Sequence, residues 1–336
     1  MNRPNLSDSR VFTRLFLVSL LALVLLFGSV SAPALGAEKV KIGSLMALSG
    51  GLSKYGPPIK NGALLAVKDL NDAGGVLGKE VDLVVKDTAT KPSVGRDAAS
   101  KLVNIEGVPV IIGALSSGVT RTVSSITSAN QTVLISPSAT SPAITNLEDN
   151  DYTFRTAIPD KFQGRVLAKV ASNLGYEKVS VIFVNNSYGK GLAGIVKKNF
   201  EKAGGKITAM VPYKQNLPTY GGEAAKAVEE NPDAILVIGY PTGGNKLLQK
   251  IIELGYEGNY LFPDGMKGEG VAPGPTCPVD GPASEQYISG SYGTAPTSSA
   301  PAADKFKKAY NDEFGPSAVP FKAQAYDATV VAALAI

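Results

Sequence analysis

The stretch VPVIIGALSSGVTRTVSSITSANQTVLISPSAT, residues 108–140, contains the structural unit that recurs along the chain. An apolar run ends at Leu115, a polar helical segment starts near Gly118, and a second apolar run begins at Thr132. Two short apolar runs joined by a helical segment predict two parallel strands with a crossover helix. Hydroxyl side chains follow both strands, at the edge where open α/β sheets bind their ligands.

The same alternation of strand and helix continues on both sides of this stretch. Further strands are predicted at residues 40–48, 81–88, 178–186, 206–213, 233–240 and 259–265. Helices are predicted from Pro57 and at about 93–105, 162–174, 189–203 and 245–254. Repeated β-α-β units form a parallel sheet covered by helices on both faces. The sequence therefore predicts two α/β units in tandem, and 336 residues are enough for two domains.

The C-terminal part of the chain is less regular. Residues 266–301 are rich in Gly, Pro and Ser and predict a loop with one strand, while 302–313 and 322–336 predict helices. The last helix contains YDATVVAALAI and stops without a capping residue. We therefore expect the chain to be truncated at its C-terminus within the fold.

The N-terminus has the features of an export signal. Arg3, Arg10 and Arg14 precede an apolar run from Leu15 to Val30, and small residues follow it. The run of about 16 residues is shorter than the roughly 20 that cross a bilayer. We interpret residues 1–37 as a signal peptide, cleaved after Ala34, Gly36 or Ala37, and expect a periplasmic protein. No cysteine lies near these positions, so the sequence excludes a lipidated form.

The composition excludes several classes of function. The sequence has no histidine and one cysteine, Cys277, so Ser-His-Asp catalysis, His-ligated metals and internal disulfides are all excluded. The formal net charge of +4 falls further without the basic leader, which argues against nucleic-acid binding. We therefore expect a non-enzyme that uses no cofactor or metal, although an exported α/β enzyme stays an alternative. The sequence assigns no role to Cys277.

A glycine pattern at residues 189–194 resembles a dinucleotide-binding motif. GKGLAG matches G-x-G-x-x-G, lies after a predicted strand and opens a helix. However, NNSY separates the strand from Gly189, and the next strand ends in Tyr213-Lys214 where such a site needs an acid. We interpret these glycines as residues that allow close packing at a helix start.

Polar side chains lie at the carboxyl ends of predicted strands in both units. They are Ser116, Ser117 and Thr120, then Ser138 and Thr140 of the segment Ser138-Ala139-Thr140, and in the second unit Tyr188, Tyr240 and Asp264. Free amides at a helix start suit a carboxylate, although a serine there is also an ordinary N-cap. Asp264 is the only acid of the set, and Pro263-Asp264-Gly265 also favours a simple turn. The set predicts a ligand cleft between the two units.

At these residues the chain resembles the periplasmic binding proteins of branched-chain amino acid transporters. The resemblance runs from Val40 to Ile336 and rests on KIGSLMALSGGLSKYG, GALLAVKDLNDAGGVLGKEV, the pair GALSSGVT and LISPSAT, SYGKGLA, and AYDA. It implies the type I periplasmic binding fold, with two doubly wound α/β lobes, three crossovers and an interlobe ligand cleft. Lobe one would comprise residues 38–158 plus 288–336, and lobe two residues 159–287.

The resemblance also implies roles for individual residues. It places Ser117 and Thr140 on the ligand's α-carboxylate, with backbone groups of Ser138 and Ala139 beside them. Tyr188 and Tyr240 would close from lobe two, Tyr55 would line the side-chain pocket, and Asp264 would face the ammonium group. The chain departs from the family in two places: the family usually has a glutamate at Asp264 and a run of serines at Ser117-Gly118-Val119.

These implications define the expected function. We expect a monomeric receptor that traps a branched-chain or other aliphatic amino acid by hinge closure and delivers it to an ABC transporter permease. Relatives in this family bind amides, urea or aromatic carboxylates, so a receptor for one of these is an alternative. A ligand sensor that signals through a membrane partner is another.

Overall fold

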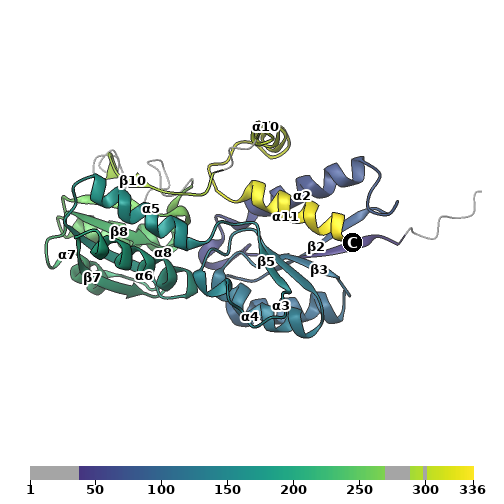
Figure 1. Cartoon of the computed structure of the whole chain (residues 1–336), viewed down its shortest axis with the longest axis horizontal. Helices are drawn as coiled ribbons and strands as arrows, with labels where there is room; N and C mark the ends of the chain where they lie inside the picture. Colours follow the sequence, from purple (N-terminus) through teal and green to yellow (C-terminus); the bar gives the residue numbers. More distant parts are fainter. Residues whose placement is uncertain (1–37, 269–287, 298–300) are drawn as a thin grey trace, which may run out of the picture. The chain divides into compact units, whose positions relative to one another are not determined.

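The computed structural model describes residues 38–268, 288–297 and 301–336, and Lys39–Ile336 form one compact unit. Two parallel sheets of five strands each organise the described residues (Figure 1). The strand order is β2-β1-β3-β4-β5 in the first sheet and β10-β9-β8-β6-β7 in the second. The predicted architecture of two parallel α/β lobes is therefore confirmed. The predicted signal peptide and Cys277 lie outside the described residues.

The first sheet has buried apolar strands at its centre and partly exposed strands, β2 and β5, at its edges. Its strands are β1 (Val40–Met46), β2 (Val81–Asp87), β3 (Val110–Gly113), β4 (Val133–Ser136) and β5 (Thr153–Arg155). Helices α3 (Pro92–Asn104) and α4 (Ser117–Ala129) pack together, and α2 (Gly56–Asp72) packs against α11 (Lys322–Ala335). Pro57 and Pro58 fit the first turn of α2 because the missing amide hydrogens have no partner there anyway.

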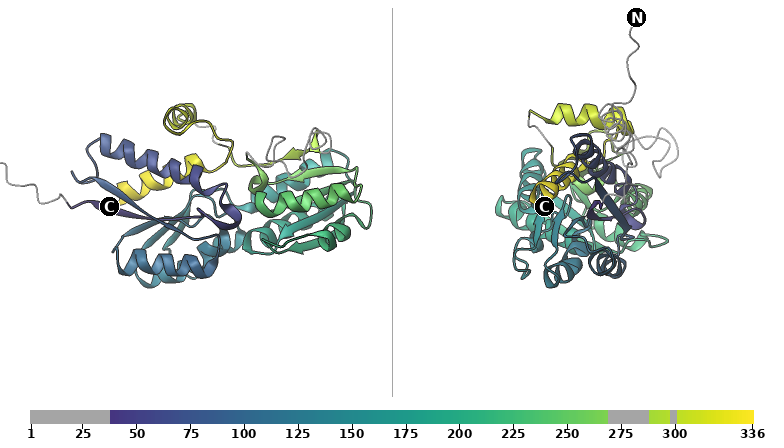
Figure 2. Two further views of the ribbon diagram at one scale, coloured as in Figure 1. Left: turned by 180° about the vertical axis from the view of Figure 1, so that it is seen from behind. Right: turned by 90° about the vertical axis from the view of Figure 1, so that its right-hand side faces the viewer.

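The second sheet repeats this arrangement. Its strands are β6 (Lys178–Val184), β7 (Lys206–Tyr213), β8 (Ala234–Ile238), β9 (Asn259–Phe262) and β10 (Tyr292–Gly293). Helices α5 (Asp160–Asn173) and α6 (Ser187–Lys202) pack side by side, and α7 (Gly221–Val228) packs against α8 (Pro241–Glu253). Figure 1 shows α5 and α6 in front of this sheet, and the reverse view in Figure 2 shows the opposite helices.

The strand order of each sheet determines where a ligand can bind. In the first sheet β1 has β2 on one side and β3 on the other, and in the second β6 lies between β7 and β8. The order of winding reverses at these strands, so the loops after them diverge and leave a crevice at the carboxyl edge. The polar residues predicted from the sequence follow β3, β4, β6, β8 and β9.

Two passages between the sheets can be followed, although residues 298–300 of the second lie outside the described part of the chain. The chain leaves β5 of the first sheet for α5 of the second, and after β10 it continues to α10 (Ala303–Phe314) and α11, which both contact α2. The third crossover and the lobe boundaries remain predictions. No helix among the described residues is long and apolar enough to span a bilayer.

Several elements differ in length from the expectation. The strand predicted at 132–140 ends at Ser136, because Pro137 has no amide hydrogen to donate to a neighbouring strand. Helix α8 begins at Pro241, four residues earlier than predicted, because proline suits the first helical position. Residues 138–140 are thereby released into a loop, which positions them for the site described below.

The glycines of the GKGLAG segment serve helix packing at two of three positions. A Cβ atom at Gly189 would lie 2.1 Å from the carbonyl oxygen of Val184, and one at Gly191 would lie 2.9 Å from Cδ of Pro142. A Cβ atom at Gly194 would have no heavy atom within 4 Å. Close packing thus explains Gly189 and Gly191, but not Gly194.

This difference predicts opposite effects on stability. Gly189→Ala should lower the free energy of unfolding by about 1–3 kcal/mol, since backbone atoms must move to admit the methyl group. Gly194→Ala should raise it by up to about 1 kcal/mol, because alanine favours an exposed helix interior. Urea denaturation of both variants measures the two values. Equal destabilisation by both would contradict the packing interpretation.

Candidate ligand-binding site

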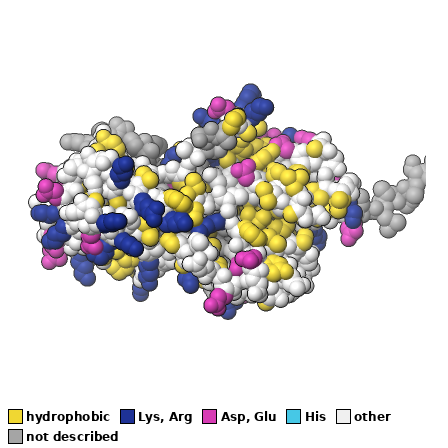
Figure 3. All heavy atoms as spheres, viewed as in Figure 1, with side chains coloured by type: hydrophobic (Ala, Val, Ile, Leu, Met, Phe, Trp, Pro, Cys, Tyr) yellow, Lys and Arg dark blue, Asp and Glu magenta, His cyan; other side chains and the backbone are white. Residues whose placement is uncertain are grey.

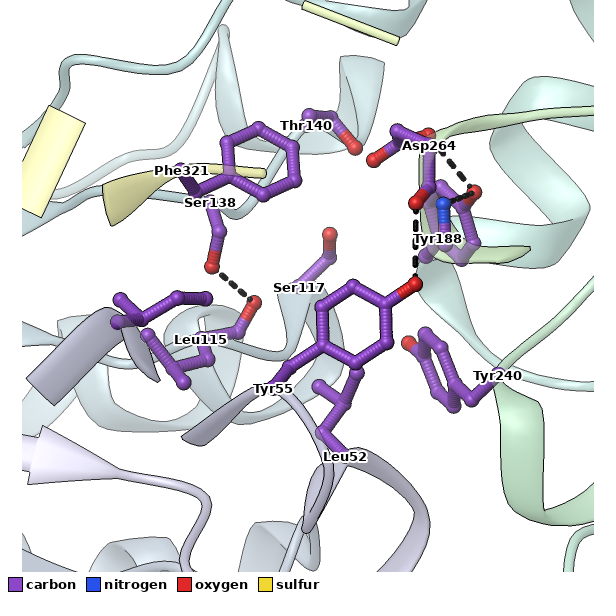
Figure 4. Close-up of a pocket in the computed structure, with 12 residues that line it drawn as sticks. Leu52, Tyr55, Leu115, Ser117, Ser138, Thr140, Tyr188, Tyr240, Asp264 and Phe321 are labelled. Carbon is purple, nitrogen blue, oxygen red and sulfur yellow. Dashed lines mark hydrogen bonds between the residues drawn. The ribbon is translucent and has the colours of Figure 1, made fainter. Parts of the chain in front are cut away.

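A pocket lies where the carboxyl ends of the two sheets meet (Figure 4). It is lined by Leu52, Tyr55, Ile59, Leu115, Ser117, Ser138, Thr140, Tyr188, Tyr240, Asp264, Gly265 and Phe321. The space between the lining atoms, including the mouth, is about 350 Å³, but the enclosed cavity is only about 30 Å³, room for very few water molecules. A ligand of amino-acid size therefore needs some of these side chains to move apart.

Seven of the eight residues predicted to bind ligand line this pocket, and Ala139 does not. The amide of Ala139 donates to Oγ of Ser136 at 3.0 Å, and the same hydroxyl donates to the carbonyl of Ala114 at 2.6 Å. Arg155 donates to the carbonyl of Ser141 at 2.9 Å from the other side of the loop. Ser136 and Arg155 thus hold the 137–141 loop in place, and the amide of Ala139 is occupied in doing so.

Three hydroxyl groups face the pocket from the first sheet. Oγ of Ser117 accepts a hydrogen bond from the amide of Ser141 at 3.3 Å, and Oγ of Ser138 donates to the carbonyl of Leu115 at 3.1 Å. Oγ1 of Thr140 is buried and has no hydrogen-bond partner among the described residues. Because buried hydroxyls are almost always paired, Thr140 is the hydroxyl best placed to bind a ligand.

Helix α4 places its N-terminal end at the same pocket. Ser117 is its first residue, and Ser116 occupies the N-cap position without using its side chain as a cap. The first amides of a helix have no partner inside the helix, and they carry its positive dipole end. This end of α4, together with the hydroxyls of Ser117 and Thr140, provides donors suited to an anion.

Two tyrosines form the opposite wall. The rings of Tyr188 and Tyr240 stack with centroids 5.7 Å apart and planes 12° from parallel. Tyr240 is the N-cap residue of α8, and its hydroxyl accepts a hydrogen bond from the side-chain nitrogen Nδ2 of Asn186 at 3.1 Å. Tyr188 lies in the first turn of α6, and its hydroxyl donates to Oδ1 of Asp264 at 2.9 Å. The tyrosine wall is therefore fixed and also orients the carboxyl group of Asp264.

Asp264 combines the two roles that the sequence left open. It starts a short 3₁₀ turn, η3 (Asp264–Met266), as Pro-Asp-Gly predicts, yet its side chain is buried and lines the pocket. Burial raises the pKa of Asp264 to about 6, and the hydrogen bond from Tyr188 partly offsets this effect. A buried carboxylate with this pKa favours a positively charged neighbour.

A second buried acid, Asp160, was not predicted from the sequence. It is the first residue of α5, it is fully buried, and neither carboxylate oxygen has a hydrogen-bond partner among the described residues. Burial and the charge of Asp264 raise the pKa of Asp160 well above its usual range, whereas the positive charge of Arg155 acts in the opposite direction. Its amide donates to the carbonyl of Thr140 at 2.8 Å, which fixes it beside that residue.

The only sequence signal for Asp160 was its position two residues before the helix predicted at 162–174, where an acid is common for electrostatic reasons alone. Two unneutralised carboxyl groups in one buried region are costly unless a proton or a cation accompanies them. The neighbourhood of Asp160 and Asp264 therefore provides the negative end of the site.

The remaining lining residues are apolar. Tyr55 directly precedes α2, and its hydroxyl lies 2.7 Å from the carbonyl oxygen of Lys267 and 3.2 Å from that of Asp264. Phe321, the residue before α11, is held at φ 71° and is buried against the pocket. Leu52, Ile59 and Leu115 complete this part. The pocket thus has a donor end, an acidic end and an apolar wall.

A pocket of this kind between two parallel-sheet lobes is typical of solute-binding proteins. The chain belongs to the periplasmic binding protein family, whose match covers residues 39–336.

Two relatives are similar to this chain over most of its length. The chain is 31% identical over 247 residues to a Leu/Ile/Val-binding protein of Rhizobium johnstonii, a match that covers 72% of this chain and 65% of the relative. It is 28% identical over 307 residues to a substrate-binding protein of a chemotactic signal transduction system in Halobacterium salinarum, covering 89% and 70%. The chain therefore spans about two thirds of the length of these relatives.

A solved structure supports the same family. The branched-chain amino acid substrate-binding protein of Streptococcus pneumoniae, in complex with isoleucine, superposes with a TM-score of 0.74 at 26% identity. The match covers 89% of this chain and 84% of the other. The fold predicted from the sequence is thus the fold of known amino-acid-binding proteins.

Proposed function

We propose that this protein is an exported receptor for a small amino acid with an aliphatic side chain. The receptor closes around its ligand and delivers it to an ABC transporter permease; it carries out no chemical reaction. The observation that carries the proposal is that a donor end and an acidic end lie beside an apolar wall, and that the two ends are joined by the hydrogen bond from the amide of Asp160 to the carbonyl of Thr140. An α-amino acid is the simplest molecule with a matching carboxylate, ammonium group and side chain.

The carboxylate of the ligand binds at the start of α4. The hydroxyls of Ser117 and Thr140 and the first amides of the helix donate to it, with Ser138 beside them. Hydrogen bonds to a charged group are stronger than those between neutral groups, and the pocket excludes most water. This arrangement needs no positively charged side chain, because the helix end supplies the positive potential.

The ammonium group of the ligand lies toward Asp264, with Asp160 close by. In the unliganded pocket burial raises the pKa of both acids, and the charge of Asp264 raises the pKa of Asp160 further, so the pair holds a proton more readily than separate exposed carboxyls would. An arriving ammonium replaces that proton as the positive partner. Binding an amino acid should therefore release protons below neutral pH.

The apolar wall accepts the side chain of the ligand. Leu52 and Tyr55 come from the segment that precedes α2, and Phe321 comes from the segment that precedes α11, so a ligand that contacts all three draws these two segments together. The hydroxyl of Tyr55 already bonds to the 264–267 turn of the second lobe, which is the type of contact that holds a closed state. Closure by differential contact in this way is how a ligand shifts a conformational equilibrium.

The relatives support this proposal, since the names of two of them refer to branched-chain amino acids. The family match supports a periplasmic location. We also propose that a signal peptide is cleaved from residues 1–37, and that the lobes comprise residues 38–158 plus 288–336 and residues 159–287. The name of the Halobacterium relative supports a second candidate, a receptor that reports its ligand to a chemotaxis system. The pocket chemistry is the same for both, and only the membrane partner differs.

Calorimetric titration with leucine and with benzoate, each at about pH 7.5 and about pH 5, tests the proposal. Leucine should bind at the higher pH, and its affinity should fall up to about tenfold per unit as the pH drops below about 6, because protonated Asp264 no longer attracts the ammonium group. Benzoate, which is repelled by ionised acids, should show the opposite trend. Tighter binding of benzoate than of leucine would overturn the amino-acid assignment.

A further inference from the structure

Two adjacent helices of the second lobe carry an unusual number of cations. On α5, Lys161, Arg165 and Lys169 are spaced four residues apart and are all exposed. On α6, Lys190, Lys198 and Lys202 fall on one stripe with the same period, interrupted only by Gly194. Because residues four apart share a helix face, each helix presents one row of positive charges.

These cations lack acidic partners within the part of the chain that the structure describes. Among the ion pairs of that part, only Lys197 with Glu201 lies on these two helices. The other acid of α5 and α6 is Asp160, which is buried at the ligand pocket. Arg121 of α4 adds a further charge beside α6, where it donates to the hydroxyl of Ser187. In Figure 3 dark blue side chains gather over this pair of helices.

Exposed apolar side chains accompany the row on α5. Phe162 and Val166 are 47% and 50% exposed and lie one residue after Lys161 and Arg165, respectively. Nζ of Lys161 lies 5.1 Å from the centre of the Phe162 ring. A helix that combines exposed apolar residues with a basic stripe has the character of a membrane-surface helix.

The composition of the surface favours lipid over a protein partner. Five of its six exposed cations are lysines, and lysine is depleted from the centres of protein–protein contacts, where arginine is enriched. Anionic lipid headgroups, in contrast, attract lysine and arginine alike as point charges. The two rows are extended and do not surround a pocket that would fit one partner side chain.

We propose that the α5–α6 surface, defined by Lys161, Arg165, Lys169, Lys190, Lys198 and Lys202, binds the anionic phospholipid surface of a membrane. The protein would thereby concentrate next to the membrane without a spanning helix. Phe162 and Val166 enter the headgroup region while the cations contact phosphates. This inference does not depend on which solute the pocket binds.

Vesicle sedimentation tests the surface. The protein used is residues 38–336, because 39–336 form a compact unit and the apolar run at 15–30 would itself bind lipid. Vesicles of phosphatidylcholine containing about one third phosphatidylglycerol should bind the protein at low salt, and pure phosphatidylcholine should not. Since one cation near an anionic surface changes partitioning about fivefold, the variant K161Q/R165Q/K169Q should bind about a hundredfold less.

A matched control changes the same number of charges elsewhere in the second lobe. Lys214, Lys226 and Lys246 are exposed and lie outside α5 and α6, so K214Q/K226Q/K246Q should keep most of the binding. Ligand titration of each variant shows that the pocket is intact. Equal loss in both triple variants would show attraction by net charge alone and would overturn the proposal. So would a wild-type protein that ignores anionic vesicles, which would leave an acidic protein as the partner of this surface.

Discussion

Replacing Asp264 by asparagine should weaken the binding of leucine by about 30-fold to several thousand-fold. The change keeps the shape of the side chain and an oxygen that can accept from the hydroxyl of Tyr188, but it removes the negative charge. An ammonium group buried without a counter-charge costs about 2–5 kcal/mol, and this cost appears as lost affinity. Calorimetric titration of the variant measures the effect directly.

The same substitution distinguishes the classes of ligand. If the ligand is a carboxylate without an amine, Asp264→Asn removes a like charge and should leave its affinity equal or better. Asp304, an exposed residue of α10, offers a matched control, because D304N removes one negative charge from a side chain that does not line the pocket. A D264N protein that binds leucine as tightly as the wild type would show that Asp264 has no role at the ammonium group.

Stability provides an independent check on this variant. The pKa of Asp264 is raised in the folded protein to about 6, so the unliganded fold loses stability as the pH rises from about 4 through about 6, and this loss is complete near neutral pH. Asparagine carries no charge, so burying it does not lower the stability of the fold in this way. The D264N protein should therefore be as stable as the wild type or more stable near neutral pH, and a loss of affinity cannot be attributed to unfolding.

Local sequence rules predicted most of the fold. Apolar runs such as 178–186 and 233–240 correspond to strands at nearly the expected residues, because buried parallel strands need continuous apolar side chains. The alternation of such runs with helices leaves few topologies open. The ends of elements were less certain, as at Ser136 and Pro241, because they depend on single hydrogen bonds.

The pocket was predicted less completely, for a physical reason. Residues that directly follow strands, such as Thr140 and Tyr240, could be found because the carboxyl edge of a sheet gathers them. Asp160 and Phe321 belong to segments that reach the pocket only through tertiary packing, and no local pattern marks them. The basic α5–α6 surface was not predicted either, because a nearly neutral total charge does not show that cations gather on two helices.

The second large predicted effect on affinity concerns the hydroxyl groups of Ser117 and Thr140 at the donor end of the pocket. Ser117→Ala and Thr140→Ala each remove one hydrogen bond to the carboxylate of the ligand, which is worth about 1.5–3 kcal/mol when the partner is charged. The affinity for leucine should fall about tenfold to 150-fold in each variant. Calorimetric titration at neutral pH is again the measurement, and Thr140→Ser, which keeps the hydroxyl, is the matched control.

The two variants should differ in the stability of the unliganded protein. Thr140→Ala removes a hydroxyl that has no partner among the described residues, so the thermal midpoint should change little. Ser117→Ala leaves the amide of Ser141 without its acceptor and should lower the free energy of unfolding by about 1 kcal/mol. Affinity and stability are thus separable at Thr140. Wild-type affinity in both alanine variants would mean that the carboxylate of the ligand binds somewhere other than the start of α4.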